Sequence, residues 1–431
     1  MEQVLTEPFS TVAWANDTNI YEVNLRQYTD EGTFNAFIKE LPRLRHMGIE
    51  TLWFMPITPI SKEKRLGTLG SYYACSSYVQ TNPEYGTISD FKNLVVAAHD
   101  LGFKVIIDWV ANHTGWDHEW TKQHPGFYRR NLEGNFYDAH GWNDVIDLNY
   151  DNPALWTAMI GAMEFWVREC WIDGFRCDMA MLVPLDFWKT ARRQLDSIKK
   201  LFWLAECEEV NYHEVFDATY TWKWLHKMEA YWRQETDISG LDEVLKYYDS
   251  MFPATSQRVM FTTNHDENSH SGSEYERLGA SAEVFAVLCC TWNAVPLIYS
   301  GQELPNKKRL KFFDKDYIEW NGHFLLDNFF RQLLSLRKNN PALKAGSTDV
   351  VTYRLHTDAN QFVFSFLRKN TQTGNEVLVI LNLSAQDKPL VHITDGELTG
   401  NYTNVFTNAV KDFTSEKHFA LQPWEYQVYA R

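Results

Sequence analysis

Gly102-Phe-Lys-Val-Ile-Ile-Asp108 shows the structural unit that recurs through most of this chain. The segment before it carries apolar residues at the spacing of one buried helix face: Phe91, Leu94, Val95, Ala98 and Leu101. Gly102 is typical of the residue that follows a helix, and the run Lys104–Ile107 predicts a buried strand. The unit is therefore a helix, a tight turn and a strand that ends on a carboxylate.

Similar units follow one another along the sequence. Besides Lys104–Ile107, the predicted strands are Ile20–Leu25, Thr51–Ile57, Gly174–Asp178, Leu201–Glu206, Val215–Tyr220, Val259–Asn264 and Pro296–Tyr299. Helical patterns separate them, such as Phe34, Phe37, Ile38 and Leu41. Strands that alternate with helices form a parallel sheet, so eight of them predict an α/β protein with a (β/α)8 TIM barrel. The alternative, an open doubly wound sheet, is disfavoured because no Gly-rich phosphate loop follows the first strand.

Two segments interrupt this rhythm and predict further domains. Residues 113–150 hold clustered Asn, Asp, His, Gly and Trp without a period, which indicates a short inserted domain, domain B, after the third strand. Residues 346–431 alternate with period two and predict a C-terminal antiparallel β domain. The catalytic barrel is then expected to comprise residues 1–112 and 151–345.

Composition limits the classes of function. Of the 431 residues, 45% are hydrophobic, which allows a large core, and the net charge of −15 disfavours nucleic acid or an anionic membrane as partner. No apolar run reaches the roughly 18 residues of a membrane span, and no signal segment opens the sequence. The six cysteines match neither a disulfide framework nor a zinc site, which favours a cytoplasmic protein. A trimmed secreted or periplasmic form is the alternative.

Acidic residues close four of the predicted strands: Asp108, Asp178, Glu206 and Asp266. The C-terminal strand ends of a parallel barrel converge on one mouth, where catalytic residues are placed. One such acid is usually a helix cap or a structural ion pair, but four together indicate a site. Three carboxyls can supply the nucleophile, the general acid/base and the transition-state stabiliser of retaining glycoside cleavage. Spacing alone does not assign these roles among Asp178, Glu206 and Asp266.

Arg176 lies two residues before Asp178, so both side chains point to the same face of one strand. A buried charge without a partner costs several kcal/mol, so we expect both groups to face the barrel mouth, with Arg176 keeping Asp178 ionised. His113 and His265 are candidate donors to sugar hydroxyls, with packing against a loop as the alternative. The ligand patterns of metal hydrolases, HxH and HExxH, are absent from these strand ends.

Four short strings resemble the conserved regions of the α-amylase family of glycoside hydrolases. They are Asp108-Trp-Val-Ala-Asn112-His113, Gly174-Phe-Arg176-Cys-Asp178, Phe202-Trp-Leu-Ala-Glu206 and Asn264-His265-Asp266. The resemblance implies that Asp178 is the nucleophile, Glu206 the general acid/base and Asp266 the transition-state stabiliser. It also implies substrate contacts by Asp108, His113, Arg176 and His265. The implied reaction is retaining cleavage of α-1,4-glucosidic bonds in starch-type glucans or maltooligosaccharides.

Further positions match the family more loosely. Tyr73 resembles the aromatic residue that stacks on the sugar at the cleavage point, although a core or loop role is the alternative. Asn112 and Asp147 match positions that bind calcium in many members, so a structural Ca²⁺ is a candidate cofactor; no organic cofactor is implied. Met181 and Leu182 replace the Lys-His pair that many α-amylases carry, which changes the leaving-group side of the cleft.

Three functions remain open at this level. The leading hypothesis is an endo-acting α-amylase, because Asp178, Glu206 and Asp266 are all present. The short inserted domain also favours an open cleft for polymer or long oligosaccharide. An α-glucosidase or α-glucan transferase would use the same acids, with water or a sugar hydroxyl releasing the glycosyl-enzyme. A non-catalytic glycan-binding protein is a remote alternative, because such relatives typically lack one of the catalytic acids.

Overall fold

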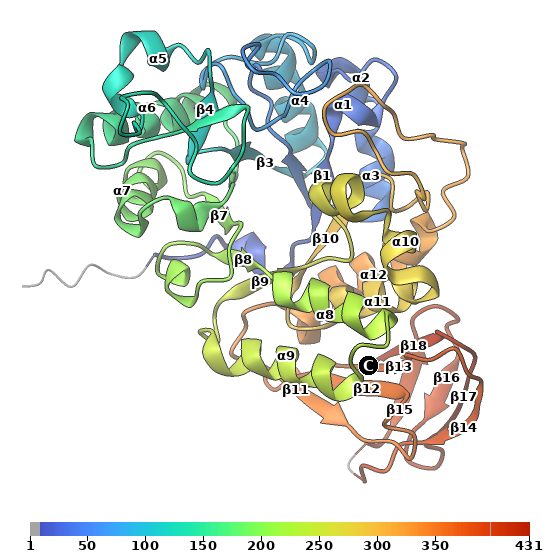
Figure 1. Ribbon diagram of the computed structural model, residues 1–431. Helices are drawn as coiled ribbons and strands as arrows, with labels where there is room; N and C mark the ends of the chain where they lie inside the picture. The colour runs from blue at the N-terminus through green and yellow to red at the C-terminus, as the bar shows by residue number, and fades with distance from the viewer. Residues whose placement is uncertain (1–8, 397) are drawn as a thin grey trace, which may run out of the picture.

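The computed structural model describes residues 9–396 and 398–431, so residues 1–8 of the predicted first barrel segment lie outside it. Its centre is a closed parallel barrel with strand order β1-β10-β9-β8-β7-β6-β3-β2 (Figure 1). The barrel strands are β1 (Ile20–Val23), β2 (Thr51–Phe54), β3 (Lys104–Trp109), β6 (Gly174–Cys177), β7 (Phe202–Ala205), β8 (Ala218–Tyr220), β9 (Gln257–Met260) and β10 (Val295–Tyr299). The predicted TIM barrel is confirmed.

Helices surround the barrel. They are α1 (Leu25–Tyr28), α2 (Phe34–Ile38), α3 (Leu41–Met47), α4 (Ile88–Asp100), α6 (Pro153–Cys170), α7 (Leu185–Asp196), α8 (Trp222–Trp232), α9 (Ile238–Met251), α10 (Glu274–Leu278), α11 (Ala282–Thr291) and α12 (Asp327–Asn339). The predicted helix from Phe34 to Leu41 is divided into α2 and α3. Pro42 explains the division, because its ring clashes with the carbonyl four residues earlier, that of Ile38. In the part of the chain that the structure describes, no helix is long and apolar enough to cross a membrane.

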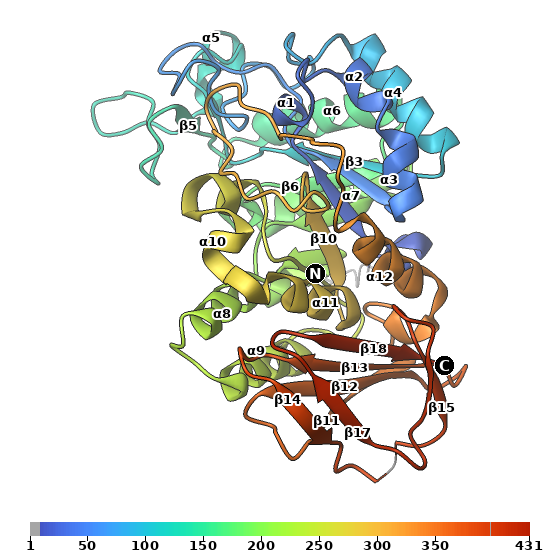
Figure 2. The ribbon, with the colours of Figure 1, turned by 90° about the vertical axis from the view of Figure 1, so that its right-hand side faces the viewer.

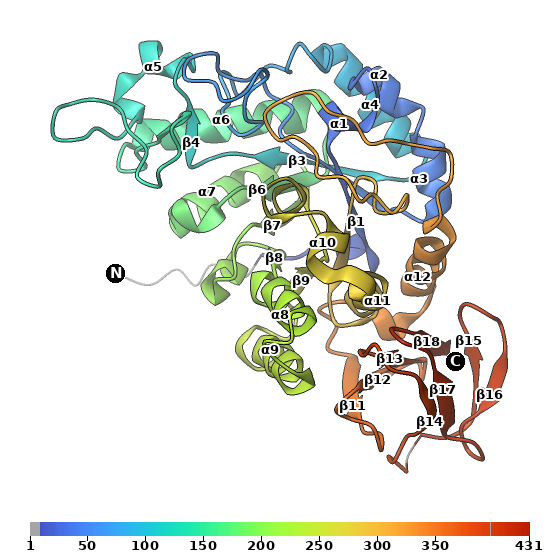
Figure 3. The same cartoon turned by 45° about the vertical axis from the view of Figure 1, so that its right-hand side comes forward.

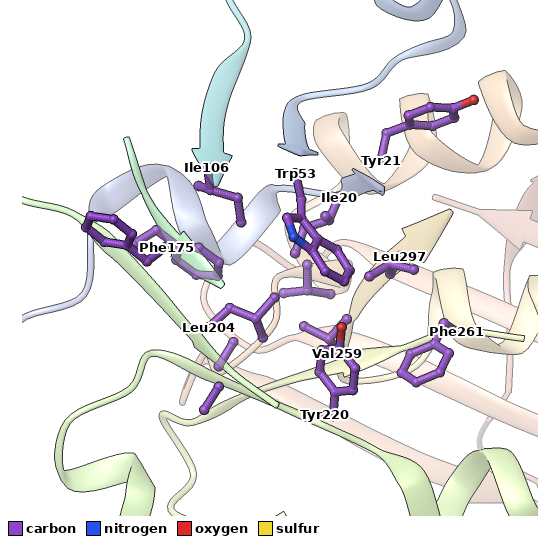
Figure 4. Close-up of a cluster of buried hydrophobic side chains, with 14 of the residues drawn as sticks. Ile20, Tyr21, Trp53, Ile106, Phe175, Leu204, Tyr220, Val259, Phe261 and Leu297 are labelled. Atoms are coloured by element: carbon purple, nitrogen blue, oxygen red, sulfur yellow. The ribbon is translucent and has the colours of Figure 1, made fainter. Parts of the chain in front are cut away.

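Apolar side chains fill the inside of the barrel. Figure 4 shows Ile20, Trp53, Ile106, Leu204, Val259 and Leu297 crowded within the ring of strands, and all are buried. Side chains two positions apart along a strand share a face. Residues two positions after Ile20, Ile106 and Leu204 therefore also face inward, one level closer to the C-terminal mouth. These residues are Glu22, Asp108 and Glu206.

The predicted strands differ from the observed ones in their bounds, as in β2, which ends at Phe54 instead of Ile57, and two of the differences have a local cause. β8 begins at Ala218 instead of Val215, because the amides of Val215 and Phe216 both bond to the carbonyl of Tyr212 and turn the chain there. β9 ends at Met260 instead of Asn264. Its partner in β10 at that point is Pro296, which has no N–H to continue the ladder. Residues 261–264 therefore form a loop to the barrel mouth, and His265 and Asp266 begin the helical turn that follows.

Domain B and the C-terminal domain lie at opposite ends of the molecule (Figures 1 and 2). The segment after β3 contains the antiparallel pair β4 (His113–Gly115) and β5 (Val145–Asp147), with α5 (Trp120–Gln123) between them. The C-terminal strands are β11 (Val350–Leu355), β12 (Val363–Asn370), β13 (Glu376–Asn382), β14 (Lys388–His392), β15 (Asn401–Asn404), β16 (Val410–Asp412), β17 (His418–Leu421) and β18 (Tyr426–Ala430). They form antiparallel sheets, as predicted.

The C-terminal domain packs on the barrel helices through aromatic side chains. Trp292, directly after α11, lies 4.8 Å from Phe366 and 6.0 Å from Phe364 between ring centroids. All three residues are buried. This contact lies away from the barrel mouth, so the C-terminal domain supports the barrel without contributing to the site at the opposite end (Figure 3).

Candidate active site

Arg176 organises the acidic residues at the barrel mouth. Its side chain is fully buried, and Nη1 donates to both oxygens of Asp108, at 3.0 and 3.2 Å, and to Oδ1 of Asp178 at 2.9 Å. Nη2 forms an ion pair of 2.8 Å with Oε2 of Glu206. Neighbouring strands place these groups together, because Asp108 of β3 stands opposite Arg176 of β6 in the barrel. One guanidinium therefore contacts three of the four predicted acids.

A strained residue adds a second contact to Glu206. Met179 adopts the left-handed region, with φ 40° and ψ 46°, which is uncommon for a residue with a side chain. In this conformation its backbone N–H donates to Oε2 of Glu206 at 3.0 Å. Unusual backbone geometry of this kind is often found at functional sites. The Glu206 carboxyl is thus held on one oxygen by a main-chain donor and by Arg176.

The buried surroundings of Asp178 and Glu206 raise the pKa of both carboxyls. Burial raises the pKa of Glu206 to about 7; Arg176 opposes this, while Asp178 and Asp266 add to it. Burial also raises the pKa of Asp178 to about 6, again opposed by Arg176. Arg176 therefore favours the ionised form of Asp178, as the sequence suggested, but burial outweighs it. The proton is held more readily by Glu206 than by Asp178, which suits an acid and a nucleophile.

His265 lies on the other side of Asp108. Its Nε2 is 2.7 Å from the hydroxyl of Tyr73 and 3.2 Å from Oδ2 of Asp266. The Tyr73 hydroxyl donates to Oδ2 of Asp108 at 3.0 Å, and the Tyr73 ring stacks on the imidazole with centroids 5.4 Å apart. The pKa of His265 is raised to about 9, because the neighbouring Asp266 and Glu22 outweigh its burial. Tyr73, His265 and Asp266 are thus brought together as the sequence predicted.

His113 also faces the site, from β4. It lines the central cavity, and its ring packs edge-on against Trp142 at 5.4 Å. Burial lowers the pKa of His113 to about 4, so the imidazole is neutral at pH 7. Asn112 directly precedes β4, and Asp147 ends β5 and pairs with His113, so both lie at the base of domain B and not in the cluster around Arg176.

The cavity at the mouth has a volume of about 390 Å³, within the roughly 300–1,000 Å³ of small-molecule sites. Tyr73, His113, Asp178, Glu206 and Asp266 line it. Sequence reasoning missed the other lining residues that matter below: Leu66, Trp142, Met179, His270, Phe312 and Phe313. Most of these come from long connections without periodicity, which carry no signal in a single sequence.

Sequence reasoning also missed Glu22. It lies on β1, is fully buried, and bonds to Nδ1 of His265 at 2.5 Å. A signal was present, because Glu22 is a charge inside an apolar strand that is covered on both faces, as Arg176 is. The inward acid and the distant histidine form an ion pair when the imidazole is protonated.

Fold and site together define a TIM-barrel enzyme with paired carboxyls at the barrel mouth, as glycosidic bond cleavage requires. Comparisons with known proteins agree. The model of the alpha amylase catalytic domain matches residues 3–137 and 126–321. The chain therefore belongs to the α-amylase family of glycoside hydrolases and is a hydrolase of the α-amylase type.

Individual relatives share the fold over nearly the whole chain. The noncanonic maltogenic α-amylase AmyB of Thermotoga neapolitana is 29% identical, with a TM-score of 0.85 over 96% of each chain. An α-amylase of Lactobacillus plantarum is 28% identical, with a TM-score of 0.87 over 97% of this chain and 99% of the other. The α-amylase MalA of Haloarcula japonica is 26% identical over 404 residues, which cover 88% of this chain but 57% of that relative.

Proposed function

We propose that this protein is a retaining glycoside hydrolase that cleaves α-1,4-glucosidic bonds in starch-type glucans or maltooligosaccharides. The observation that carries the proposal is the pairing of Asp178 and Glu206 through the single guanidinium of Arg176. Retaining enzymes need two carboxyls close together, roughly 5–5.5 Å apart, and here the two terminal nitrogens of one guanidinium hold them, at 2.9 Å from Asp178 and 2.8 Å from Glu206. Their raised pKa values, about 6 and about 7, rank them as nucleophile and acid.

The reaction proceeds in two displacements. An oxygen of Asp178 attacks the anomeric carbon of the bound glucan, the bond to the leaving oxygen breaks, and Glu206 donates its proton to that oxygen. The product is a glycosyl ester on Asp178 and a carboxylate on Glu206. Glu206 then takes a proton from water as the water oxygen attacks the anomeric carbon. The ester bond breaks, Asp178 is released as a carboxylate, and Glu206 is protonated again.

The remaining groups stabilise the transition state and orient the sugar. Asp266 is partly exposed toward the cavity, where its carboxylate faces the positive charge that develops on the sugar ring. Neutral His113, which lines the cavity, serves as a donor to sugar hydroxyls. Protonated His265 holds the Tyr73 hydroxyl and the Asp266 carboxylate in place. The Tyr73 ring offers an apolar face for stacking. Asp108 keeps Arg176 and the Tyr73 hydroxyl in place through its two oxygens.

An α-glucosidase or glucan transferase is the second proposal. Met179 lines the cavity beside Glu206, and Met181 is 39% exposed. Apolar side chains on the leaving-group side suit the face of an acceptor sugar, which competes with water for the glycosyl ester. Release of glucose alone, or of products longer than the substrate, would favour this second proposal over hydrolysis to mixed maltooligosaccharides.

A structural Ca²⁺ in domain B is a further part of the proposal. Asp138 and Asp147 lie side by side, and Oδ1 of each is buried without a hydrogen-bond partner. Asn112 is buried nearby, and such oxygen donors suit Ca²⁺. Among residues 9–396 and 398–431, no group of three or more His, Cys, Asp or Glu forms a metal site, so backbone carbonyls or water would complete the coordination. A chelator should lower the unfolding temperature of the wild type but not of Asp147→Asn; equal unfolding temperatures with and without chelator in the wild type would contradict this.

Amide substitutions test the catalytic assignment. Glu206→Gln and Asp178→Asn should each reduce turnover of a maltooligosaccharide by about a thousandfold or more, because each removes a group that acts in the reaction itself. Asp186→Asn is the matched control, because this acid is exposed on α7 and should retain wild-type turnover. Near-normal activity of Glu206→Gln would overturn the proposed mechanism.

A further inference from the structure

The long connections around the cavity are joined to one another into a wall. The β2–α4 connection meets the β10–α12 connection where the amides of Leu69 and Gly70 both donate to the carbonyl of Phe313, at 2.9 and 3.2 Å. The amide and hydroxyl of Thr68 donate to Oδ1 of Asp314 at 2.8 and 2.7 Å. The two connections are adjacent at the mouth of the barrel (Figures 1 and 3).

Close packing leaves no gap at this junction. Gly67 has φ +63°, and a Cβ at this position would lie 2.5 Å from the Cβ of Phe313 and 2.8 Å from its carbonyl oxygen. Leu66 and Phe313 both face the cavity from either side of the junction. Apolar side chains of both connections therefore line the cavity beside their junction.

Helix α1 holds this junction from below. Nη1 of the buried Arg26 donates to the carbonyls of Gly70 and Phe312, at 3.0 and 3.3 Å, and thus joins both connections. The side-chain amide of Gln27 donates to the carbonyls of Lys311 and Asp314, each at 2.8 Å. Buried side-chain donors of this kind fix the backbone that they hold. The junction is therefore part of the folded framework and not a free lid.

The wall continues into domain B. Oδ2 of Asp117 accepts hydrogen bonds from the amides of Lys62 and Glu63, at 2.9 and 3.2 Å. The Lys64 ammonium lies 3.0 Å from the centroid of the Trp116 ring, whose Nε1 donates to the carbonyl of Asn143. We call the joined segments 62–70, 116–117, 143 and 312–314 the closing rim. Four of its residues line the cavity: Leu66, Asn143, Phe312 and Phe313.

The chemistry of the site identifies which end of the cavity the rim closes. Glu206 protonates the leaving oxygen, so the leaving-group sugars lie beside Glu206 and Met179. Phe312 lies at the other end, where its ring stacks on Tyr73 at 6.3 Å and on His265 at 6.4 Å. Those two rings flank Asp108 and Asp266. The closing rim therefore lies at the end of the cavity opposite Glu206, beyond the sugar that Asp178 attacks. This end is the non-reducing side of the scissile bond.

We infer that the closing rim limits the donor side of the cleft to about one or two glucose units, the ligand size that a cavity of this volume holds. This inference rests on the proposed function. The enzyme then cuts near non-reducing ends and releases short products, and long glucan chains extend only past Glu206. This inference differs from the open cleft that the short domain B favours.

The test is the product pattern of the purified enzyme on maltoheptaose labelled at its reducing end and on soluble starch. The wild type should release unlabelled mono- or disaccharide from the first time point, while the average length of starch falls slowly relative to the appearance of reducing ends. Rapid loss of starch length with mixed products would overturn the inference and leave the proposed function intact. Failure to cleave either substrate would overturn the proposed function, and this inference with it.

Two variants open the rim by different means. Phe313→Ala removes a wall side chain, and the double variant Thr68→Val, Asp314→Ala removes the side-chain bonds between the connections. Each should raise the fraction of products longer than a disaccharide several-fold. Leu325→Ala is the control, because this apolar residue lies on the same β10–α12 connection but is 72% exposed, and its products should match those of the wild type. Unfolding temperatures show whether each variant is folded. Unchanged products from both folded rim variants would overturn the inference. If neither variant folds, the product pattern of the wild type alone decides whether the inference holds.

Discussion

The carboxylate of Glu22 and the imidazole of His265 form a buried pair across the inside of the barrel, with Oε1 and Nδ1 2.5 Å apart. The pair gives His265 a fixed orientation and favours its protonated form. Nε2 is then a donor as well, toward the Tyr73 hydroxyl, which in turn donates to Asp108. A chain of hydrogen bonds thus runs from Glu22 on β1, through His265 and Tyr73, to Asp108, which Arg176 holds.

Glu22→Gln should lower the pKa of His265 from about 9. The groups that face the imidazole are Glu22, Tyr73, Asp108, Arg176 and Asp266, and the substitution removes one of the anions. Burial and Arg176 then favour the neutral ring, so His265 should lose its proton at a lower pH than in the wild type. Histidine NMR titration measures the effect.

Glu22→Asp keeps the negative charge and should restore part of the raised pKa of His265. A purely structural role for Glu22 would not require this result. Glu243→Gln changes the same functional group on the exposed surface of α9 and serves as the control. An unaltered titration of His265 in the folded Glu22→Gln variant would contradict the role assigned to this pair.

The pH dependence of kcat/KM should be a narrow bell. The nucleophile must be ionised, so activity falls as the pH drops through about 6, where Asp178 is protonated. The acid must carry its proton, so activity falls as the pH rises through about 7, where Glu206 ionises. Because the two carboxyls interact, the two limbs describe the titration of the pair and not of either residue alone. A substrate with a leaving group that needs no protonation should lose the alkaline limb, and persistence of that limb would argue against Glu206 as the acid.

His118→Gln should change how the stability of the protein depends on pH. Burial lowers the pKa of His118 to about 3, below the ordinary value of about 6.5. A group with a depressed folded-state pKa stabilises the fold above pH 6.5, and this contribution is lost as the pH falls toward about 3. As the pH falls from 6.5 to 4, the unfolding temperature of the variant should therefore rise relative to that of the wild type. A constant difference over that range would contradict the linkage.

Gly174→Ala should destabilise the barrel next to the catalytic strand. A Cβ at this position of β6 would lie 2.1 Å from the carbonyl oxygen of Phe202 on β7, so the two strands would have to separate. We expect a loss of about 3 kcal/mol or more. Gly161→Ala is the matched control, because this exposed position of α6 has no atom within 4 Å of the new Cβ and should gain about 0.5–1 kcal/mol. Urea unfolding of both variants measures the difference.

The fold and the centre of the site could be predicted because both depend on local pattern. A strand that ends on an acid is visible within a few residues, and barrel closure brings such ends together without further information. Thus Asp108, Arg176, Asp178 and Glu206 meet as the sequence indicated. Val215 shows the limit of this reasoning, because an apolar residue in a turn has the same local pattern as one at the start of a strand.

The residues that the sequence did not indicate depend on contacts between distant segments. Glu22 acquires its role from His265, which lies 243 positions away. Phe313 joins the wall of the cavity through its backbone carbonyl, and a backbone acceptor has no signature in the type of residue that carries it. The connection after β10 has no periodicity either, so its path over the cavity follows only from the folded structure.

The antiparallel pairing of β4 and β5 has a consequence for how this enzyme can be changed. His113 and Asp147 are partners in that pairing, so the segment between them leaves and re-enters the barrel at neighbouring points. A segment with adjacent ends can be exchanged as a module without moving either flanking strand. Trp142, Asn143 and Asp144, which line the cavity, lie within it, whereas Asp178, Glu206 and Asp266 do not. Replacing this module would therefore alter the choice of sugar while the reacting carboxyls stay where they are.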